Sequence, residues 1–229
     1  LTTLVRISTG LRGGCMPAYE YLDSLEAKVN PRNSALLVID VQNDFISEGG
    51  FADKVGWPLK ANQLAVRKLQ VLLAAARRAT VPVIFIKSNY DDIFLSLPMR
   101  ERNDRQDLRI PRCIRGTWGE EFYEVTPLSE EALITKHRYS AFVDSELNAV
   151  LRAQYIQTLI LTGVYTEVCV ESTARDGYFL DYYVVVISDC CATTSQEAHS
   201  GALARCERDF GVVTTSADIM ASWSLHQTS

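Results

Sequence analysis

The chain has 229 residues, 47% of them apolar and 22% charged, which is the composition of a globular protein with a large core. Its formal net charge of −5 argues against a nucleic-acid partner, because Lys and Arg are not concentrated on a phosphate-binding face. No apolar run approaches the roughly 18 residues of a membrane span, so we expect no membrane partner and a cytoplasmic protein. The six cysteines include no CxxC pair, which predicts free thiols in a reducing compartment.

Residues 1–33 show no clear periodicity, and we interpret them as an N-terminal arm that packs on the domain or on a partner subunit. Residues 34–229 are expected to form a single domain. Within it, short β-branched runs that are apolar almost throughout predict strands covered on both faces. These strands are expected at 35–39, 81–86, 132–135, 158–161, 183–187 and 212–215.

Helical patterns lie between most of these strands. They cover 62–78, 168–180 and 195–210, and a further helix is expected to begin at the capping pair Asp144-Ser145. In the first helix we expect one stripe that contains Leu64, Lys68, Val71, Leu72 and Ala75. The alternation predicts a three-layer α/β/α fold with an open, mostly parallel, six-stranded Rossmann-like sheet. The irregular stretch 89–131 is expected to be an active-site flap or a subunit contact.

Ligands of such sheets bind beyond the carboxyl ends of the strands, so polar residues at those ends are candidate site residues. Asp40 directly follows the apolar run 36–39 and is expected to be partly desolvated there. A helix cap or turn residue explains that segment equally well. Lys136 ends the third predicted strand, so its ammonium is expected to reach the same edge, with a surface lysine as the alternative.

Cys169 lies near the junction between the fourth strand and the helix that follows it. There the helix dipole favours the thiolate and predicts a lowered pKa, and free backbone N–H groups can hold an oxyanion. A cysteine in an apolar context is usually a packing residue, but this position favours a functional one. We expect the ends of strands one, three and four to adjoin in the sheet. A thiol, a carboxylate and an ammonium then meet, a set that suits nucleophilic catalysis.

Three segments, 35–45, 136–142 and 162–178, resemble the signature blocks of the isochorismatase-like cysteine hydrolases. They occur in the right order, within a match that extends from about residue 34 to about residue 223. The second block reads KHRYSAF from Lys136, and the third reads GVYTEVCVESTARDGY from Gly163. Within the superfamily these blocks are most similar to the ureidoacrylate amidohydrolases, followed by the biuret, triuret and N-carbamoylsarcosine hydrolases.

The resemblance implies a metal-independent amidohydrolase with Cys169 as nucleophile, Asp40 as proton-transfer base and Lys136 as the third catalytic residue. It also implies a cis peptide between Val164 and Tyr165, so that the N–H groups of Tyr165 and Cys169 bind the oxyanion. The expected substrate is a small-molecule linear amide, cleaved at a ureido or carbamoyl C–N bond through a covalent acyl-enzyme. Its predicted contacts, each of which also suits ordinary packing, are Asn43, Phe45, Asn89, Tyr90, Trp118, Tyr139 and Phe142.

We expect no cofactor and no metal site. Some nicotinamidases of this superfamily hold a metal with an Asp and two histidines near strand two, but 87–92 contains no histidine. Isochorismatases act on an enol ether and do not need the cysteine, so the presence of Cys169 favours amide chemistry.

Several alternatives stay open at this point. The chain can be a nicotinamidase- or isochorismatase-type hydrolase, or a non-catalytic binding or assembly member, which would predict a damaged triad. A dinucleotide-binding oxidoreductase fits the alternating pattern, but no GxGxxG follows the first strand. The N-terminal arm exceeds what the family core requires, which favours a homo-oligomer, either a dimer or a tetramer.

Overall fold

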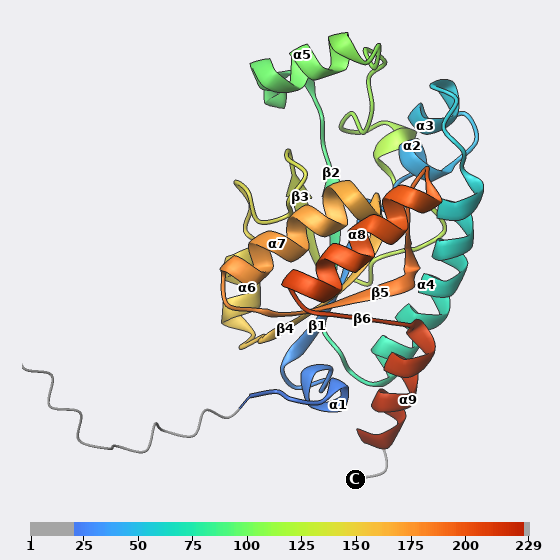
Figure 1. Cartoon of the computed structure of the whole chain (residues 1–229). Helices are drawn as coiled ribbons and strands as arrows, with labels where there is room; N and C mark the ends of the chain where they lie inside the picture. The colour runs from blue at the N-terminus through green and yellow to red at the C-terminus, as the bar shows by residue number, and fades with distance from the viewer. Residues whose placement is uncertain (1–20, 227–229) are drawn as a thin grey trace, which may run out of the picture.

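The computed structural model describes residues 21–226, and a six-stranded sheet lies at its centre (Figure 1). The strands are β1 (Ser34–Ile39), β2 (Val83–Ser88), β3 (Ala132–Lys136), β4 (Thr158–Val164), β5 (Tyr183–Ala192) and β6 (Val212–Thr214). They are arranged in the order β3-β2-β1-β4-β5-β6, and every neighbouring pair is parallel. The predicted α/β fold is therefore confirmed.

Helices connect the strands and end the described chain. They are α1 (Leu25–Lys28), α2 (Asn43–Ile46), α3 (Phe51–Lys54), α4 (Lys60–Arg78), α5 (Leu97–Arg105), α6 (Leu147–Ala153), α7 (Glu171–Phe179), α8 (Gln196–Asp209) and α9 (Ser216–His226). Shorter turns form η1 (Asp92–Phe94), η2 (Trp118–Glu120) and the π-helical η3 (Thr166–Val170). Between residues 21 and 226, no helix is both long enough and apolar enough to cross a membrane.

The helices cover both faces of the sheet, so successive residues of a strand enter different cores (Figure 1). In β1, Leu36 and Val38 pack in the core that contains α4 and α9. Ala35, Leu37 and Ile39 pack in the opposite core, with α6, α7 and α8. Because every β1 side chain is buried, the strand has a continuous apolar run instead of an alternating pattern.

Helix α4 buries only part of the predicted stripe. Leu72 and Ala75 are buried as expected, but Leu64 and Val71 are 49% and 55% exposed and Lys68 is exposed as well. The other core residues of the helix are Ala65, Val66, Leu69, Leu73 and Ala76. Apolar residues occupy so much of the circumference of this helix that more than one stripe fits the helical period. Packing against β5 and α9 decides which stripe is buried.

The order of the strands corrects one further expectation. The ends of β1 and β4 adjoin as predicted, but the end of β3 does not adjoin β1 because β2 lies between them. Ser88 is opposite Lys136 in the β2–β3 register. The small serine at this position lets the long lysine side chain pass over the end of β2.

The close approach of β1 and β4 requires a glycine beside Ile39. Gly163 is opposite Ile39 in the register and has a φ of +119°. A Cβ at this position would lie only 1.9 Å from the Ile39 carbonyl oxygen. Gly163 therefore permits the close spacing of β1 and β4 near their carboxyl ends, which are followed by Asp40 and Tyr165.

The start of the described chain packs on the domain. Trp223 in α9 is buried, and its indole N–H donates to the Val29 carbonyl oxygen at 2.8 Å. Residues 1–20, which make up most of the predicted N-terminal arm, lie outside the described residues.

Candidate active site

Asp40 is the first residue after β1 and lies at the carboxyl edge of the sheet. Its backbone is left-handed, with a φ of 54°, a conformation that Asp adopts more readily than most residues. Its N–H donates to the Ile86 carbonyl oxygen at 2.9 Å, which holds the turn against β2. The side chain is fully buried, so its carboxylate needs partners within the protein.

Lys136 supplies the counter-charge of Asp40. Its Nζ lies 2.7 Å from Asp40 Oδ2, and both side chains are excluded from solvent. The ammonium also donates to Ser88 Oγ at 2.9 Å and to the Arg138 carbonyl oxygen at 3.1 Å. Ser88 in turn donates to Asp40 Oδ1 at 2.9 Å. These bonds matter because burying two charges is costly unless both are also hydrogen-bonded.

The environment of Lys136 keeps it charged. Burial by itself lowers the pKa of Lys136, but the Asp40 carboxylate, together with Cys169 and Tyr90, raises this pKa above its ordinary value. The ammonium is therefore a fixed positive charge at neutral pH and not a proton donor.

Cys169 lies in η3, immediately before α7, and its Sγ is 3.5 Å from Lys136 Nζ. The expectation of a lowered pKa is wrong. Burial, and then the Asp40 carboxylate, raise the pKa of the Cys169 thiol, and Lys136 opposes only part of this effect. Loss of solvent disfavours the thiolate more than the neighbouring helix favours it. The resting group is therefore a thiol, which needs a base before it can act as a nucleophile.

One oxygen of Asp40 suits that role. Oδ1 accepts the Ser88 bond, whereas Oδ2, although close to Lys136, accepts no well-directed hydrogen bond from the described residues. The Lys136 ammonium is thus the only charged partner of Oδ2 among the described residues, and the oxygen retains a lone pair that can accept a proton. The Asp40 carboxylate is also near enough to Cys169 to raise the pKa of its thiol, which makes Asp40 the candidate base.

The backbone beside the thiol has an unusual conformation. The peptide bond between Val164 and Tyr165 is cis, as the family resemblance implies. The N–H of Cys169 donates to the Tyr165 carbonyl oxygen at 3.0 Å, and those of Val168 and Val170 share the same acceptor. The Cys169 N–H therefore already has a partner in this structure.

Cys169 opens onto a cavity with a mainly aromatic wall. The residues that line it are Phe45, Phe51, Trp57, Tyr90, Arg102, Leu108, Arg112, Tyr139, Tyr165, Val168 and Cys169. Tyr165 makes edge-to-face contacts with Phe45 and with Trp57, each with 5.6 Å between ring centroids. Flat apolar walls with a few polar groups are typical of small-molecule sites.

Of the predicted substrate contacts, Phe45, Tyr90 and Tyr139 line this cavity. The others have structural partners elsewhere. Asn43 donates to the Trp118 carbonyl oxygen at 2.9 Å, and the Trp118 side chain is half exposed. Asn89 bonds to Asp91, and Phe142 stacks on Tyr182 with 6.0 Å between ring centroids.

Sequence reasoning missed Ser88, Trp57, Arg102 and Arg112. Ser88 had a detectable signal, because it ends β2 at the same edge as Asp40 and Lys136. The two arginines belong to the irregular stretch 89–131, where no periodicity indicates which side chains face the thiol. Trp57 lies between α3 and α4, and only the tertiary structure shows that it lines the cavity beside Phe51 and Tyr165.

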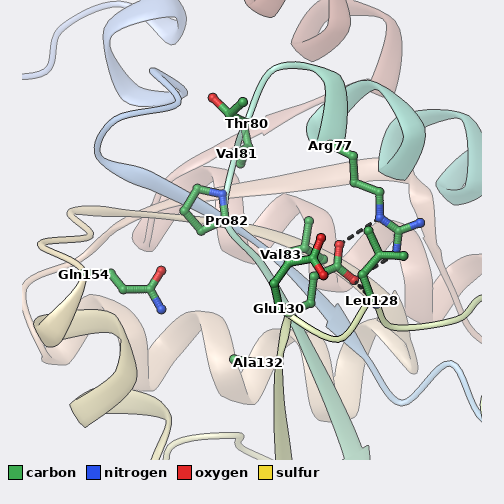
Figure 2. Close-up of a pocket in the computed structure, with 10 residues that line it drawn as sticks. Arg77, Thr80, Val81, Pro82, Val83, Leu128, Glu130, Ala132 and Gln154 are labelled. Atoms are coloured by element: carbon green, nitrogen blue, oxygen red, sulfur yellow. Dashed lines mark hydrogen bonds and ion pairs between the residues drawn. The ribbon is translucent and has the colours of Figure 1, made fainter.

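A second hollow lies at the opposite end of the sheet, where β2 and β3 begin (Figure 2). Its charged residues include Arg77, which pairs with Glu131 at 2.8 Å. It lies at the amino ends of the strands, whereas ligands of this fold class bind at the carboxyl ends. The cavity beside Cys169 is therefore the candidate active site.

Within residues 21–226, no group of three or more His, Cys, Asp and Glu side chains is arranged to hold a metal ion. His137 contacts the Asn89 carbonyl oxygen at 2.8 Å and stacks on Phe94. His199 contacts Thr166 Oγ1 at 2.9 Å. Both histidines thus have structural partners.

Comparisons with known proteins show which family the chain resembles. The isochorismatase domain model matches residues 34–218. The chain is 35% identical over 202 residues to the ureidoacrylate amidohydrolase RutB of Enterobacter sp. strain 638, covering 82% of this chain and 88% of the relative. It is 32% identical to the ureidoacrylate amidohydrolase RutB of Caulobacter segnis, covering 85% and 87%.

Among solved structures, a cysteine hydrolase from Pseudomonas syringae pv. phaseolicola 1448A superimposes with a TM-score of 0.75 at 29% identity. That alignment covers 86% of this chain and 95% of the hydrolase. The family model covers most of the described chain and includes Asp40, Lys136 and Cys169. The chain therefore belongs to the isochorismatase family, as its sequence blocks predicted.

Proposed function

We propose that this protein is a cysteine-dependent amidohydrolase that cleaves a C–N bond of a small ureido or carbamoyl compound. One observation carries the proposal: the buried Cys169 thiol contacts a buried Asp40–Lys136 ion pair and opens onto the aromatic cavity. Relatives that carry the name ureidoacrylate amidohydrolase support the choice of an amide substrate.

In the first half of the proposed reaction, Asp40 Oδ2 accepts the Cys169 proton as sulfur bonds to the substrate carbonyl carbon. The C=O π electrons move to oxygen. When the C=O bond re-forms, the C–N bond breaks, and nitrogen leaves as ammonia or an amine with the proton that Asp40 returns. Lys136 keeps its charge throughout and orients Asp40, which is protonated between the two transfers and becomes a carboxylate again after the second.

In the second half, water attacks the thioester or thiocarbamate carbon while Asp40 takes one of its protons. The C–S bond then breaks, the acid or carbamate leaves, and the proton returns to Cys169. The sum of the two halves is amide plus water giving acid plus amine, with no oxidant, reductant or metal.

The N–H groups of Tyr165 and Cys169 are the proposed oxyanion donors. Because the Cys169 N–H bonds to the Tyr165 carbonyl oxygen, it must share that bond with the oxyanion or exchange one for the other. Losing one such donor typically costs about 3 kcal/mol of transition-state stabilisation. Phe45, Tyr90 and Tyr139 line the cavity and are the predicted contacts that we keep as substrate-binding residues.

The test is ammonia release from ureidoacrylate, biuret, triuret, N-carbamoylsarcosine, maleamate and nicotinamide, in the presence of a chelator. Cys169→Ala serves as the inactive control, and circular dichroism shows that it is folded. Release from a ureido compound that the chelator leaves unchanged and that disappears in Cys169→Ala supports the proposal. Release that persists in the folded Cys169→Ala variant removes the proposed nucleophile.

We further propose that the protein is a cytoplasmic homo-oligomer and that the stretch 89–131 contributes to a subunit contact. Ile93 and Leu97, at the start of this stretch, are 83% and 81% exposed. Large apolar side chains that stand out in this way are typical of interfaces when they cluster. Light scattering of the wild type and of an Ile93→Asp/Leu97→Asp variant tests this, because loss of an interface lowers the molar mass.

A further inference from the structure

The cavity beside Cys169 contains two positive charges that the proposed reaction does not use. Arg112 and Arg102 both line it, and no acidic residue does so within the described chain. Neither arginine belongs to an ion pair among residues 21–226. By contrast, Arg100, Arg105 and Arg109 of the same stretch each pair with an Asp or Glu.

Arg112 is the more informative of the two because it is buried. Only 9% of its surface is exposed, and its side-chain hydrogen bond goes to the neutral Asn103 Oδ1 at 3.2 Å. Its guanidinium carbon lies 4.9 Å from the centre of the Phe51 ring and 5.0 Å from that of Tyr90. These contacts stabilise a cation, but among residues 21–226 most of its N–H donors have no acceptor and its charge has no counter-charge.

Hydrogen bonds to Asp44 hold both the segment that carries Arg112 and the aromatic residue on which it packs. Asp44 accepts the Cys113 N–H with Oδ2 at 2.6 Å and the Phe51 N–H with Oδ1 at 3.0 Å. One carboxylate thus anchors both the loop that carries Arg112 and the helix that carries Phe51. The position of the guanidinium is therefore organised before any ligand binds, which lowers the entropic cost of binding.

Arg112 is linked to the reacting groups through a single ring. It packs on Tyr90, whose hydroxyl lies 3.3 Å from Ser88 Oγ, the group that bridges Lys136 and Asp40. Arg102 approaches from α5 and lies over the Tyr139 ring at 5.9 Å. The two cations and the thiol are thus parts of one small cavity.

The geometry points to an anion subsite formed by Arg112, with Arg102 at its margin, that binds a carboxylate of the substrate. The inference rests on the proposed function and narrows it: the substrate is an amide or ureido compound that also carries a carboxylate a few bonds from the reacting carbonyl. A carboxylate matches the planar guanidinium fork in shape and supplies the missing counter-charge. Neutral amides of the same size leave Arg112 buried and unpaired.

The first test uses alkylation and does not depend on turnover. Iodoacetate and iodoacetamide differ only in the carboxylate, and mass spectrometry of the Cys169 peptide gives the rate constant for each. We expect Arg112→Gln to lower the iodoacetate-to-iodoacetamide ratio by about 10-fold or more, as for loss of a charge-assisted bond. Arg105→Gln, which removes an exposed arginine of α5, leaves the ratio unchanged.

The second test compares turnover of ureidoacrylate with that of its methyl ester. Arg112→Gln should lower kcat/KM for the acid by about 10- to 100-fold and change that for the ester far less. Arg112→Lys retains the positive charge but not the planar guanidinium, so its kcat/KM for the acid should lie between those of the wild type and Arg112→Gln. Arg102→Gln gives a smaller effect in the same direction, and provides a second variant if Arg112→Gln does not fold.

The outcomes separate this inference from the proposed function. An alkylation ratio that is the same in wild type, folded Arg112→Gln and folded Arg102→Gln overturns the anion subsite, whatever the enzyme hydrolyses. A wild type that hydrolyses no amide, but whose Cys169 prefers iodoacetate through Arg112, supports the subsite and counts against the amidohydrolase. Equal losses for acid and ester in Arg112→Gln show a structural role for the arginine and also overturn the inference.

Discussion

The Lys136 ammonium and the Asp40 carboxylate form a buried ion pair, with 2.7 Å between Nζ and Oδ2. The same ammonium lies 3.5 Å from the Cys169 thiol, so the pKa of the thiol depends on both the Lys136 cation and the Asp40 anion. Lys136 favours the thiolate, and Asp40 opposes it. This balance leads to predictions in which the reactivity of the thiol and the turnover of the enzyme change in opposite directions.

Replacing Asp40 with Asn should make Cys169 more reactive toward iodoacetamide while abolishing hydrolysis. The Asp40 charge raises the pKa of the thiol, so its removal leaves Lys136 to stabilise the thiolate. Turnover is lost because no group carries the proton to the leaving nitrogen. Alkylation rates at pH 7.5 and ammonia release on the same samples check both parts. Slower alkylation in Asp40→Asn would show instead that Asp40 is needed even to form the resting nucleophile.

The raised pKa of Cys169 has a direct consequence for pH dependence. A thiol with a raised pKa stays protonated to higher pH, so its alkylation rate should keep rising beyond about pH 8.5, where an ordinary cysteine begins to level off. Lys136→Met removes the opposing positive charge and should shift the profile to still higher pH. A peptide that spans Cys169 provides the ordinary profile for comparison. A plateau below pH 8 in the wild type contradicts the prediction.

Ser88→Ala should lower kcat while leaving the fold intact. Ser88 donates to Asp40 and accepts from Lys136, so its loss leaves both charges with one partner fewer and less firmly oriented. We expect a decrease of about 10- to 100-fold in kcat, equivalent to one hydrogen bond to a charged group. Because Ser88 acts by positioning Asp40 and Lys136, the pH dependence of Cys169 alkylation should also change. The exposed Ser224→Ala is the matched control, and an unchanged kcat in Ser88→Ala removes the positioning role.

The ion pair should also be visible in stability. Lys136→Met leaves Asp40 buried without its counter-charge, which typically costs about 3–5 kcal/mol in the free energy of unfolding. The double variant Asp40→Asn/Lys136→Met should recover much of that loss. Because folding raises the Lys136 pKa, the contribution of the ammonium to stability is complete below the ordinary lysine pKa of about 10.4 and is lost as the pH rises through the higher pKa of the folded state. Urea unfolding of the single and double variants measures the coupling, and additive losses would contradict it.

Gly163→Ala should be strongly destabilising, by about 4 kcal/mol or more, because its Cβ would meet the Ile39 carbonyl oxygen. Gly49→Ala is the matched control. Gly49 also has a positive φ, but nothing lies within 4 Å of its Cβ position, so only the conformational cost of about 1 kcal/mol applies. Equal losses in the two variants, measured by thermal unfolding, would mean that the β1–β4 approach is not the cause.

The comparison of sequence and structure shows which signals were local. Strand β1 is buried on both faces, and four consecutive apolar residues before Asp40 reveal this without any partner. Helix α4 is the opposite case, because its sequence allows more than one apolar stripe and only packing against α9 and β5 buries Leu69 instead of Leu64. The strand order was missed for a similar reason. A few neighbouring residues show where a strand ends, but residues far away in the chain decide which strand lies beside it.

By itself, the sequence determined the alternation of strands and helices, the family, the strand-end positions of Asp40 and Lys136, and the position of Cys169 at a strand-to-helix junction. Each of these depends on residue type and on spacing over a few residues. The tertiary structure decided the rest: Ser88 as the bridge, the raised pKa of Cys169, and the position of Arg102 and Arg112 beside the thiol. Burial and charge compensation depend on what surrounds a group in space, and residues far apart in the chain supply those surroundings.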